Sequence, residues 1–272
     1  MKLIDCFMYF DEDLVLEIRL NTLANVVDEF IIAEATKDHA GRNKKLNFDI
    51  KKYPNFKDKI KYLIIDDLPI DVKTKKVNWH ENHYRDQFQR NALERGYSKY
   101  DKDDLIMISD IDEIPDPNKI KEFDIKNKYA CFLQKNFQSK INLQNMSDGF
   151  WPGTKICQKK NLKSPQWLRN IKTKKRPFWK FYKPQEPQLI FDGGWHFSFL
   201  KKPNSIKNKI ISYSHQEFNK EEFVNIKNIE NKISQGKDLF DRKISYKIVP
   251  VDKSYPEYIY KNIDIFKDWI AS

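Results

Sequence analysis

Short apolar runs alternate with helix-like stretches through the first half of the chain. Apolar side chains recur every three or four residues over 16–27 and 81–95, which is the spacing of a helix with one buried face. The runs that predict strands are residues 3–10, 29–34, 60–65, 105–108 and 129–133. Strands that alternate with helices predict an α/β fold, with a mixed, mostly parallel sheet flanked by helices.

The second half of the chain has a different pattern. Residues 139–200 hold four of the six tryptophans and four of the seven glycines, which predicts short strands and ordered loops lined by aromatic side chains. After Pro203 the pattern becomes helical again, and Asn219 followed by Glu222 predicts a capped helix that ends at Gly236. We therefore expect one compact domain with a C-terminal helical extension.

Composition excludes several classes of protein. The chain has 272 residues of which 40% are hydrophobic, enough for a sizeable core and too many for a disordered chain. The mean hydropathy is −0.76 and no apolar run approaches the roughly 18 residues of a membrane span. Asp5 interrupts the segment where a secretion signal would be apolar. Three cysteines without metal-site spacing predict reduced thiols, and hence a soluble cytoplasmic protein.

The chain is basic. Its 50 Lys and Arg against 39 Asp and Glu give a net charge of +11, which suits nucleic acid, an anionic membrane surface or a ligand that carries phosphate. Lys, Asn and Ile are abundant together, which indicates AT-rich coding. We therefore expect most of this charge to be ordinary solvated surface, with peripheral membrane contact through it left open.

Residues 108–115 contain the strongest candidate site. In an extended chain Asp110 and Asp112 project to the same side at the carboxyl end of a buried strand, where open α/β sheets bind ligands. Two adjacent carboxylates repel each other unless a cation or proton lies between them, and oxygen ligands favour Mg²⁺ or Mn²⁺. The pair predicts a metal site; the alternative is that these acids only solvate a loop and cap the helix that Asp116 begins.

The helix predicted over 81–95 carries a second group of candidates. Arg85 and Gln89 share a polar face, and Arg90 and Asn91 lie beside it. Arginine suits bidentate contact with phosphate, and amides suit a sugar or a base edge. A solvated helix face is the alternative.

The aromatic segment 191–199 is a third candidate. Two glycines allow close approach of the backbone before Trp195 and His196. Trp195 offers a flat face to a sugar ring, and His196 could complete a metal site or bind phosphate, although both residue types also serve as core anchors. His215 is a second candidate histidine. The chain has no G-x-S-x-G, Walker-type or G-x-G-x-x-G motif, which argues against hydrolases, P-loop proteins and Rossmann dehydrogenases.

Taken together, several blocks of the chain resemble glycosyltransferase family 17, the family of the β-1,4-mannosyl-glycoprotein 4-β-N-acetylglucosaminyltransferases that add bisecting GlcNAc. In family order, the blocks are residues 5–10, 16–20, 88–92, 108–115, 151–154, 193–199, 212–217 and 236–240. The resemblance implies a single GT-A (Rossmann-like) domain over 1–272. Residues 1–138 would bind the nucleotide sugar, and 139–272 would form the acceptor side and the C-terminal helices.

The resemblance also implies a chemistry. It points to a UDP-sugar donor (UDP-GlcNAc in characterised members), a divalent Mn²⁺ or Mg²⁺ ion, a glycan acceptor and inversion at the anomeric carbon. Asp110 would contact the donor ribose or the metal, and Asp112 would ligate the metal through the diphosphate. Arg90 and its neighbours would lie near the nucleotide, and Glu34 near the base. Without a membrane anchor, a bacterial or virus-encoded enzyme that builds a surface glycan is expected.

Inverting transfer requires a carboxylate that takes the proton of the acceptor hydroxyl. Asp192, beside the aromatic segment, and Glu217 are the candidates from the sequence, and Asp148 is a third. Trp151 and Trp195 could form a platform for the acceptor sugar.

Two other classes of function remain open. One is a metal-dependent nuclease that uses Asp110 and Asp112, with the basic run 172–176 on the phosphates. The other is a non-catalytic carbohydrate-binding module built on the tryptophans, which the intact acidic pair argues against. We expect a nucleotide sugar and a glycan as partners, and no nucleic acid.

Overall fold

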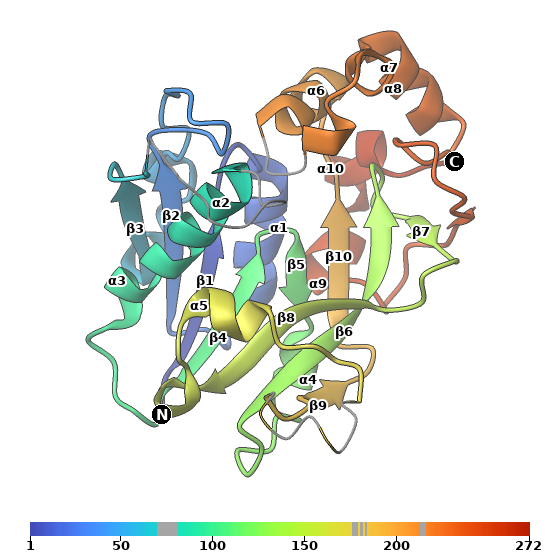
Figure 1. Ribbon diagram of the computed structural model, residues 1–272. Helices are drawn as coiled ribbons and strands as arrows, with labels where there is room; N and C mark the ends of the chain where they lie inside the picture. Colours follow the sequence, from blue (N-terminus) through green and yellow to red (C-terminus); the bar gives the residue numbers. More distant parts are fainter. Residues whose placement is uncertain (70–80, 176–178, 180–181, 183, 213–215) are drawn as a thin grey trace.

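The structure is a computed structural model that describes residues 1–69, 81–175, 179, 182, 184–212 and 216–272 (Figure 1). Its centre is a mixed sheet in which β3, β2, β1 and β4 are parallel neighbours and β8 joins β4 antiparallel. Beyond β8 the order continues through β6, β7 and β11, and β10 pairs with both β5 and β6. The predicted mixed sheet flanked by helices is therefore confirmed.

The strands have the following bounds. They are β1 (Leu3–Met8), β2 (Glu29–Ala35), β3 (Ile60–Ile65), β4 (Leu105–Asp110), β5 (Glu113–Pro115), β6 (Tyr129–Gln138), β7 (Leu143–Asn145), β8 (Trp151–Gln158), β9 (Gln188–Ile190), β10 (Gly194–Ser198) and β11 (Tyr246–Ile248).

The α-helices are mostly short. They are α1 (Asp13–Leu23), α2 (Glu81–Ala92), α3 (Glu94–Tyr97), α4 (Pro117–Ile120), α5 (Pro165–Arg169), α6 (Pro203–Ser212), α7 (Glu221–Val224), α8 (Ile226–Ser234), α9 (Glu257–Lys261) and α10 (Ile263–Phe266). Within the described ranges, none is both long and apolar enough to span a bilayer.

Two of the predicted helices are wrong in extent. The helix predicted over 81–95 ends at Ala92, and a separate turn of helix follows. The helix predicted from Asn219 to Gly236 is divided at Asn225, which is extended (φ −71°, ψ 121°) and caps α8 by accepting a hydrogen bond from the amide of Asn228. An asparagine that can cap a helix competes in this way with continuation of the preceding one.

Alternation along the strands produces a core on each face of the sheet. Phe7 and Met107 lie on the face covered by α1, α9 and α10, whereas Cys6, Ile106 and Ile108 lie on the face covered by α2, α3 and α5 (Figure 1). Because neighbouring residues of a strand alternate between faces, Asp5 and Ser109 point towards α1 and Asp110 points towards α2 and α5.

A third apolar cluster, which we call the C-terminal cluster, lies beyond the end of β10 (Figure 1). It joins α6, α7 and α8 to the sheet through Phe199, which directly follows β10. Its buried members are Phe199, Ile206, Ile210, Phe223, Ile229, Leu239 and Phe240. This cluster fixes α6 against the carboxyl end of β10.

One buried arginine connects β1, α1 and the turn that follows β4. The side chain of Arg19, on α1, is fully buried and makes a two-pronged ion pair with Asp5 of β1, with N···O distances of 2.6 and 2.8 Å. It also donates to the hydroxyl of Ser109 at 2.6 Å. Its remaining nitrogen donates to three carbonyl oxygens of the turn, those of Asp110, Ile111 and Glu113, at 3.3, 3.1 and 2.9 Å.

Removing this arginine should strongly destabilise the protein. Arg19→Met leaves the Asp5 carboxylate buried without its counter-charge, so we expect the free energy of unfolding to fall by about 3–5 kcal/mol. Urea denaturation measures the change. Arg95→Met is the matched control, because its ion pair with Asp67 is exposed and should be worth about 0–1 kcal/mol. Equal losses in the two variants would contradict the role given to Arg19.

Candidate active site

A cavity of about 340 Å³ opens at the carboxyl ends of β1, β2 and β4. Its walls include Phe10 after β1, His39 after β2, Asp110 at the end of β4 and Ser198 at the end of β10. Lys209 of α6 closes the side that faces the C-terminal cluster. Open parallel sheets bind their ligands at this edge, and here it gathers side chains from both halves of the chain.

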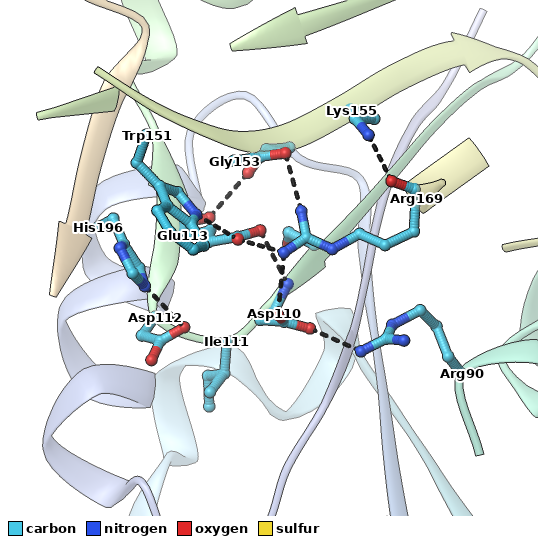
Figure 2. A network of polar contacts seen from close by, with 12 residues as sticks. Arg90, Asp110, Ile111, Asp112, Glu113, Trp151, Gly153, Lys155, Arg169 and His196 are labelled. Atoms are coloured by element: carbon cyan, nitrogen blue, oxygen red, sulfur yellow. Dashed lines mark hydrogen bonds and ion pairs between the residues drawn. The ribbon is translucent and has the colours of Figure 1, made fainter. Parts of the chain in front are cut away.

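Asp110 is held by two arginines (Figure 2). Its carboxylate oxygens lie 3.0 Å from a terminal nitrogen of Arg90, on α2, and 2.9 Å from one of Arg169, at the end of α5. Burial would raise the pKa of Asp110, but the charges of Arg169 and Arg90 outweigh it and hold this pKa well below its usual range. Asp110 is therefore ionised at neutral pH and oriented by its partners.

Glu113 supports this arrangement by contacting both Arg169 and the backbone of Asp110. It is fully buried, forms an ion pair with Arg169, and accepts hydrogen bonds from the Trp151 indole at 2.7 Å and the Asp110 amide at 3.1 Å. Lys155 holds the chain near Arg169 by donating to two carbonyl oxygens, one of them that of Ile171 at 2.7 Å. Burial lowers the pKa of Lys155 to about 8.

Asp112 faces a different set of groups (Figure 2). Its Oδ1 lies 3.7 Å from Nε2 of His196, and its Oδ2 lies 3.5 Å from the ammonium of Lys209. The His196 ring stacks on Trp151 with centroids 4.5 Å apart, and its Nδ1 is 3.0 Å from Oδ1 of Asn136. In the tautomer with the hydrogen on Nδ1, this hydrogen is donated to the amide oxygen of Asn136 and the lone pair of Nε2 points towards Asp112.

Asp112 and His196 fit part of a divalent-metal site. Across the described ranges, no three His, Cys, Asp or Glu side chains form a metal-binding group. A carboxylate and an imidazole nitrogen could still supply two ligands to an ion such as Mn²⁺ that takes its other ligands from substrate phosphates and water. Asp110 was expected to share the ion, but both its oxygens are paired with arginines.

The predicted residues of α2 divide between the cavity and its support. Gln89 and Arg90 line the cavity, and the Gln89 amide bridges the Ala33 carbonyl and the His39 ring, each at 3.0 Å. Arg85 is buried outside the lining and donates to the His39 carbonyl at 3.2 Å. Asn91 also lies outside the lining and accepts a hydrogen bond from the amide of Gln166. Arg85 therefore positions a loop of the cavity wall, and Asn91 has no place in the wall.

Glu34 and Trp195 are also support residues in this structure. Glu34 is fully buried and accepts hydrogen bonds from the amides of Asn47 and Phe48 and from the hydroxyl of Tyr62, which anchors the segment that carries the cavity residue Lys44. Trp195 is buried, and its indole donates to a backbone carbonyl at 3.0 Å. Neither residue is among those that line the cavity, and their predicted contacts with base and sugar stay predictions.

The expected catalytic bases lie outside the cavity lining. Asp192 is exposed in the turn before β10, at the opposite end of that strand from the cavity, with a left-handed φ of 48°. Asp148 is exposed and accepts a hydrogen bond from Asn145. Glu217 is exposed and follows the cavity residue Ser212 by five positions. His215 lies outside the described residues.

Comparison with known proteins identifies the family. The model of glycosyltransferase family 17 matches residues 1–267. The chain belongs to glycosyltransferase family 17. No curated protein matches it.

Two solved structures resemble the chain distantly. HddC from Yersinia pseudotuberculosis complexed with GMP-PN is 10% identical over 70% of this chain and 90% of its own, with a TM-score of 0.33. The inositol-1-phosphate CTP transferase from T. maritima is 10% identical over 100% of this chain and 98% of its own, also with a TM-score of 0.33. Likenesses this distant say nothing about what the glycosyltransferase binds.

The sequence alone did not assign roles to several site residues of the glycosyltransferase. Glu113 directly follows Asp112, and this position next to the acidic pair is the only feature of the sequence that indicates a role for it. Arg169 and Lys209 lie about 60 and 100 residues further along, so only the fold brings them to Asp110 and Asp112. The burial of Arg19 could have been inferred from the sequence, because this charged residue lies among the apolar residues Leu16, Ile18 and Leu20 of a buried helix.

The pairing of Asp110 predicts how its pKa responds to mutation. Arg169→Met should raise the pKa of this carboxyl towards the ordinary value of about 3.9, because one of two compensating charges is lost. Carbon-13 NMR of the aspartate carboxyl groups follows the titration, with Arg95→Met as the control. An unchanged Asp110 titration would contradict the pairing. Since the folded-state pKa lies below the unfolded value, the pairs stabilise the glycosyltransferase above about pH 4 and lose this effect as the pH falls further.

Proposed function

We propose that this glycosyltransferase moves a sugar, GlcNAc, from UDP-GlcNAc to a hydroxyl of a glycan acceptor, with inversion and with Mn²⁺ or Mg²⁺. The observation that carries the proposal is that Oδ1 of Asp112 and Nε2 of His196 lie 3.7 Å apart at the ligand-binding edge of the sheet. Family membership supports the transfer of a sugar, and this pair supports a metal-bound diphosphate on the donor.

The cavity is suited to a nucleotide-sugar donor, in which an anionic diphosphate joins the nucleoside to the sugar. Asp112 and His196 would hold the ion, which, when bound, would neutralise negative charge on the diphosphate. The contact with Asn136 and the stacking on Trp151 hold the His196 ring in this orientation. Arg90 lies in the same wall and is a second source of positive charge, fixed in place by Asp86 and Asp110.

The transfer itself is a displacement at the anomeric carbon. A bond forms from the acceptor oxygen to this carbon while the bond to the diphosphate oxygen breaks, and that electron pair leaves with UDP. The acceptor proton passes to a carboxylate base. Of the sequence candidates, Glu217 and Asp148 stay predictions for this role, whereas Asp192 lies at the end of β10 away from the cavity.

The nuclease alternative gains no support. A nuclease would need its basic run beside the metal, yet the described residues of that run, 172–175, are absent from the cavity walls. Lys172 and Lys174 line a separate hollow with Trp167.

Calorimetric titration with UDP-GlcNAc in the presence of Mn²⁺ tests the proposal. We expect binding that chelation of the ion weakens, and Asp112→Asn should weaken it by at least about 10-fold, since a direct ligand to the ion is lost. Asp103→Asn is the matched control, because Asp103 is exposed and pairs with Lys160 away from the cavity. The proposal fails if no UDP-sugar binds with any divalent ion, or if the two variants bind alike.

A further inference from the structure

Lys209 faces the cavity and makes only long polar contacts there. Its ammonium lies 3.5 Å from Asp112 and 3.6 Å from Glu12, and only 19% of the side chain is exposed. An ammonium–carboxylate hydrogen bond is ordinarily about 2.7–2.9 Å long. Within the described part of the chain, Lys209 makes no shorter polar contact, so its three N–H donors are incompletely used.

The carboxylates near Lys209 do not depend on it. Glu12 contacts the buried ammonium of Lys201 at 2.9 Å and accepts hydrogen bonds from the amides of Phe10 and Asp11 at 3.0 and 3.1 Å. Asp112 has His196 beside it. A purely structural lysine would be expected to approach one of these oxygens as Lys201 does.

Lys209 is nevertheless held in place. The ammonium lies over the ring of Phe199, 5.3 Å from the centroid. Phe199 has a left-handed φ of 52°, a strained conformation for a bulky residue, and it belongs to both the cavity wall and the C-terminal cluster.

We propose that Lys209 is the residue that binds the terminal phosphate of the nucleoside diphosphate, both in the donor and as the leaving group. This inference rests on the proposed function. When the bond from the anomeric carbon to the diphosphate oxygen breaks, the electron pair adds one negative charge to the terminal phosphate. Lys209 donates hydrogen bonds to that phosphate and keeps its own protons. Its long contacts to Asp112 and Glu12 leave N–H donors of Lys209 for a phosphate oxygen bound in the cavity, and Asp112 places it beside the metal ligands.

Binding of UDP and UMP separates this role from a structural one. Lys209→Met keeps the aliphatic stem and removes the charge. We expect it to weaken UDP by about 10- to 100-fold, the cost of losing a charge-assisted hydrogen bond, and UMP by no more than about 3-fold. Lys209→Arg should restore most of the UDP affinity. Lys207→Met, on the same helix and outside the cavity lining, should bind both nucleotides as the unaltered protein does.

Calorimetry with Mn²⁺ reads each affinity, and thermal unfolding shows that each variant is folded. Lys209→Gln takes the place of the Met variant if the latter does not fold, and the same contrast between UDP and UMP applies. Unchanged UDP affinity, or equal losses for UDP and UMP, would overturn the role of Lys209 and leave the proposed function standing. If the unaltered protein binds none of UDP, GDP, CDP and ADP, both proposals fall.

Discussion

The site depends on one buried ion pair. Arg19 lies between α1 and the sheet, and its guanidinium binds Asp5 while it donates to carbonyl oxygens of the turn after β4. A charge in a core is costly unless it is paired and its hydrogen bonds are satisfied, and here Asp5, Ser109 and the turn meet that requirement together. The same contacts that compensate the buried charge therefore fix the backbone from which Asp110 and Asp112 project.

From this turn the acidic side chains go to different partners. Asp110 continues the alternation of β4 and meets Arg90 and Arg169 on the α2 and α5 face, so both its oxygens are engaged. Asp112 lies beyond the strand and faces His196 and Lys209, neither of which approaches closely. Asp110 therefore holds Arg90 and Arg169 in the cavity region, whereas the carboxylate oxygens of Asp112 make only long contacts and can still bind a ligand. The C-terminal cluster matters to the chemistry because it holds α6, and with it Lys209, over this second aspartate.

Most strands and the position of the acidic pair could be predicted from the sequence. Continuous apolar runs located β3 and the buried strand β4, and the position of the acidic pair after β4 placed it at the binding edge. Helix ends were less predictable, because Asn225 can either continue a helix or cap the next one. Glu34 and Trp195 are of residue types that often contact ligands, but in the fold both side chains are buried and bind neighbouring parts of the chain. Arg169 and Lys209 could not be predicted, because only long-range packing brings them to the aspartates.

Asp112 and His196 are proposed to hold together the ion of a bound nucleoside diphosphate. A crystal structure of the protein with UDP and Mn²⁺, with anomalous data to locate the manganese, tests it most directly. We expect an anomalous peak in contact with both Asp112 and His196, with the diphosphate on the same ion. Manganese and nucleotide bound elsewhere, with both side chains unliganded, would contradict it.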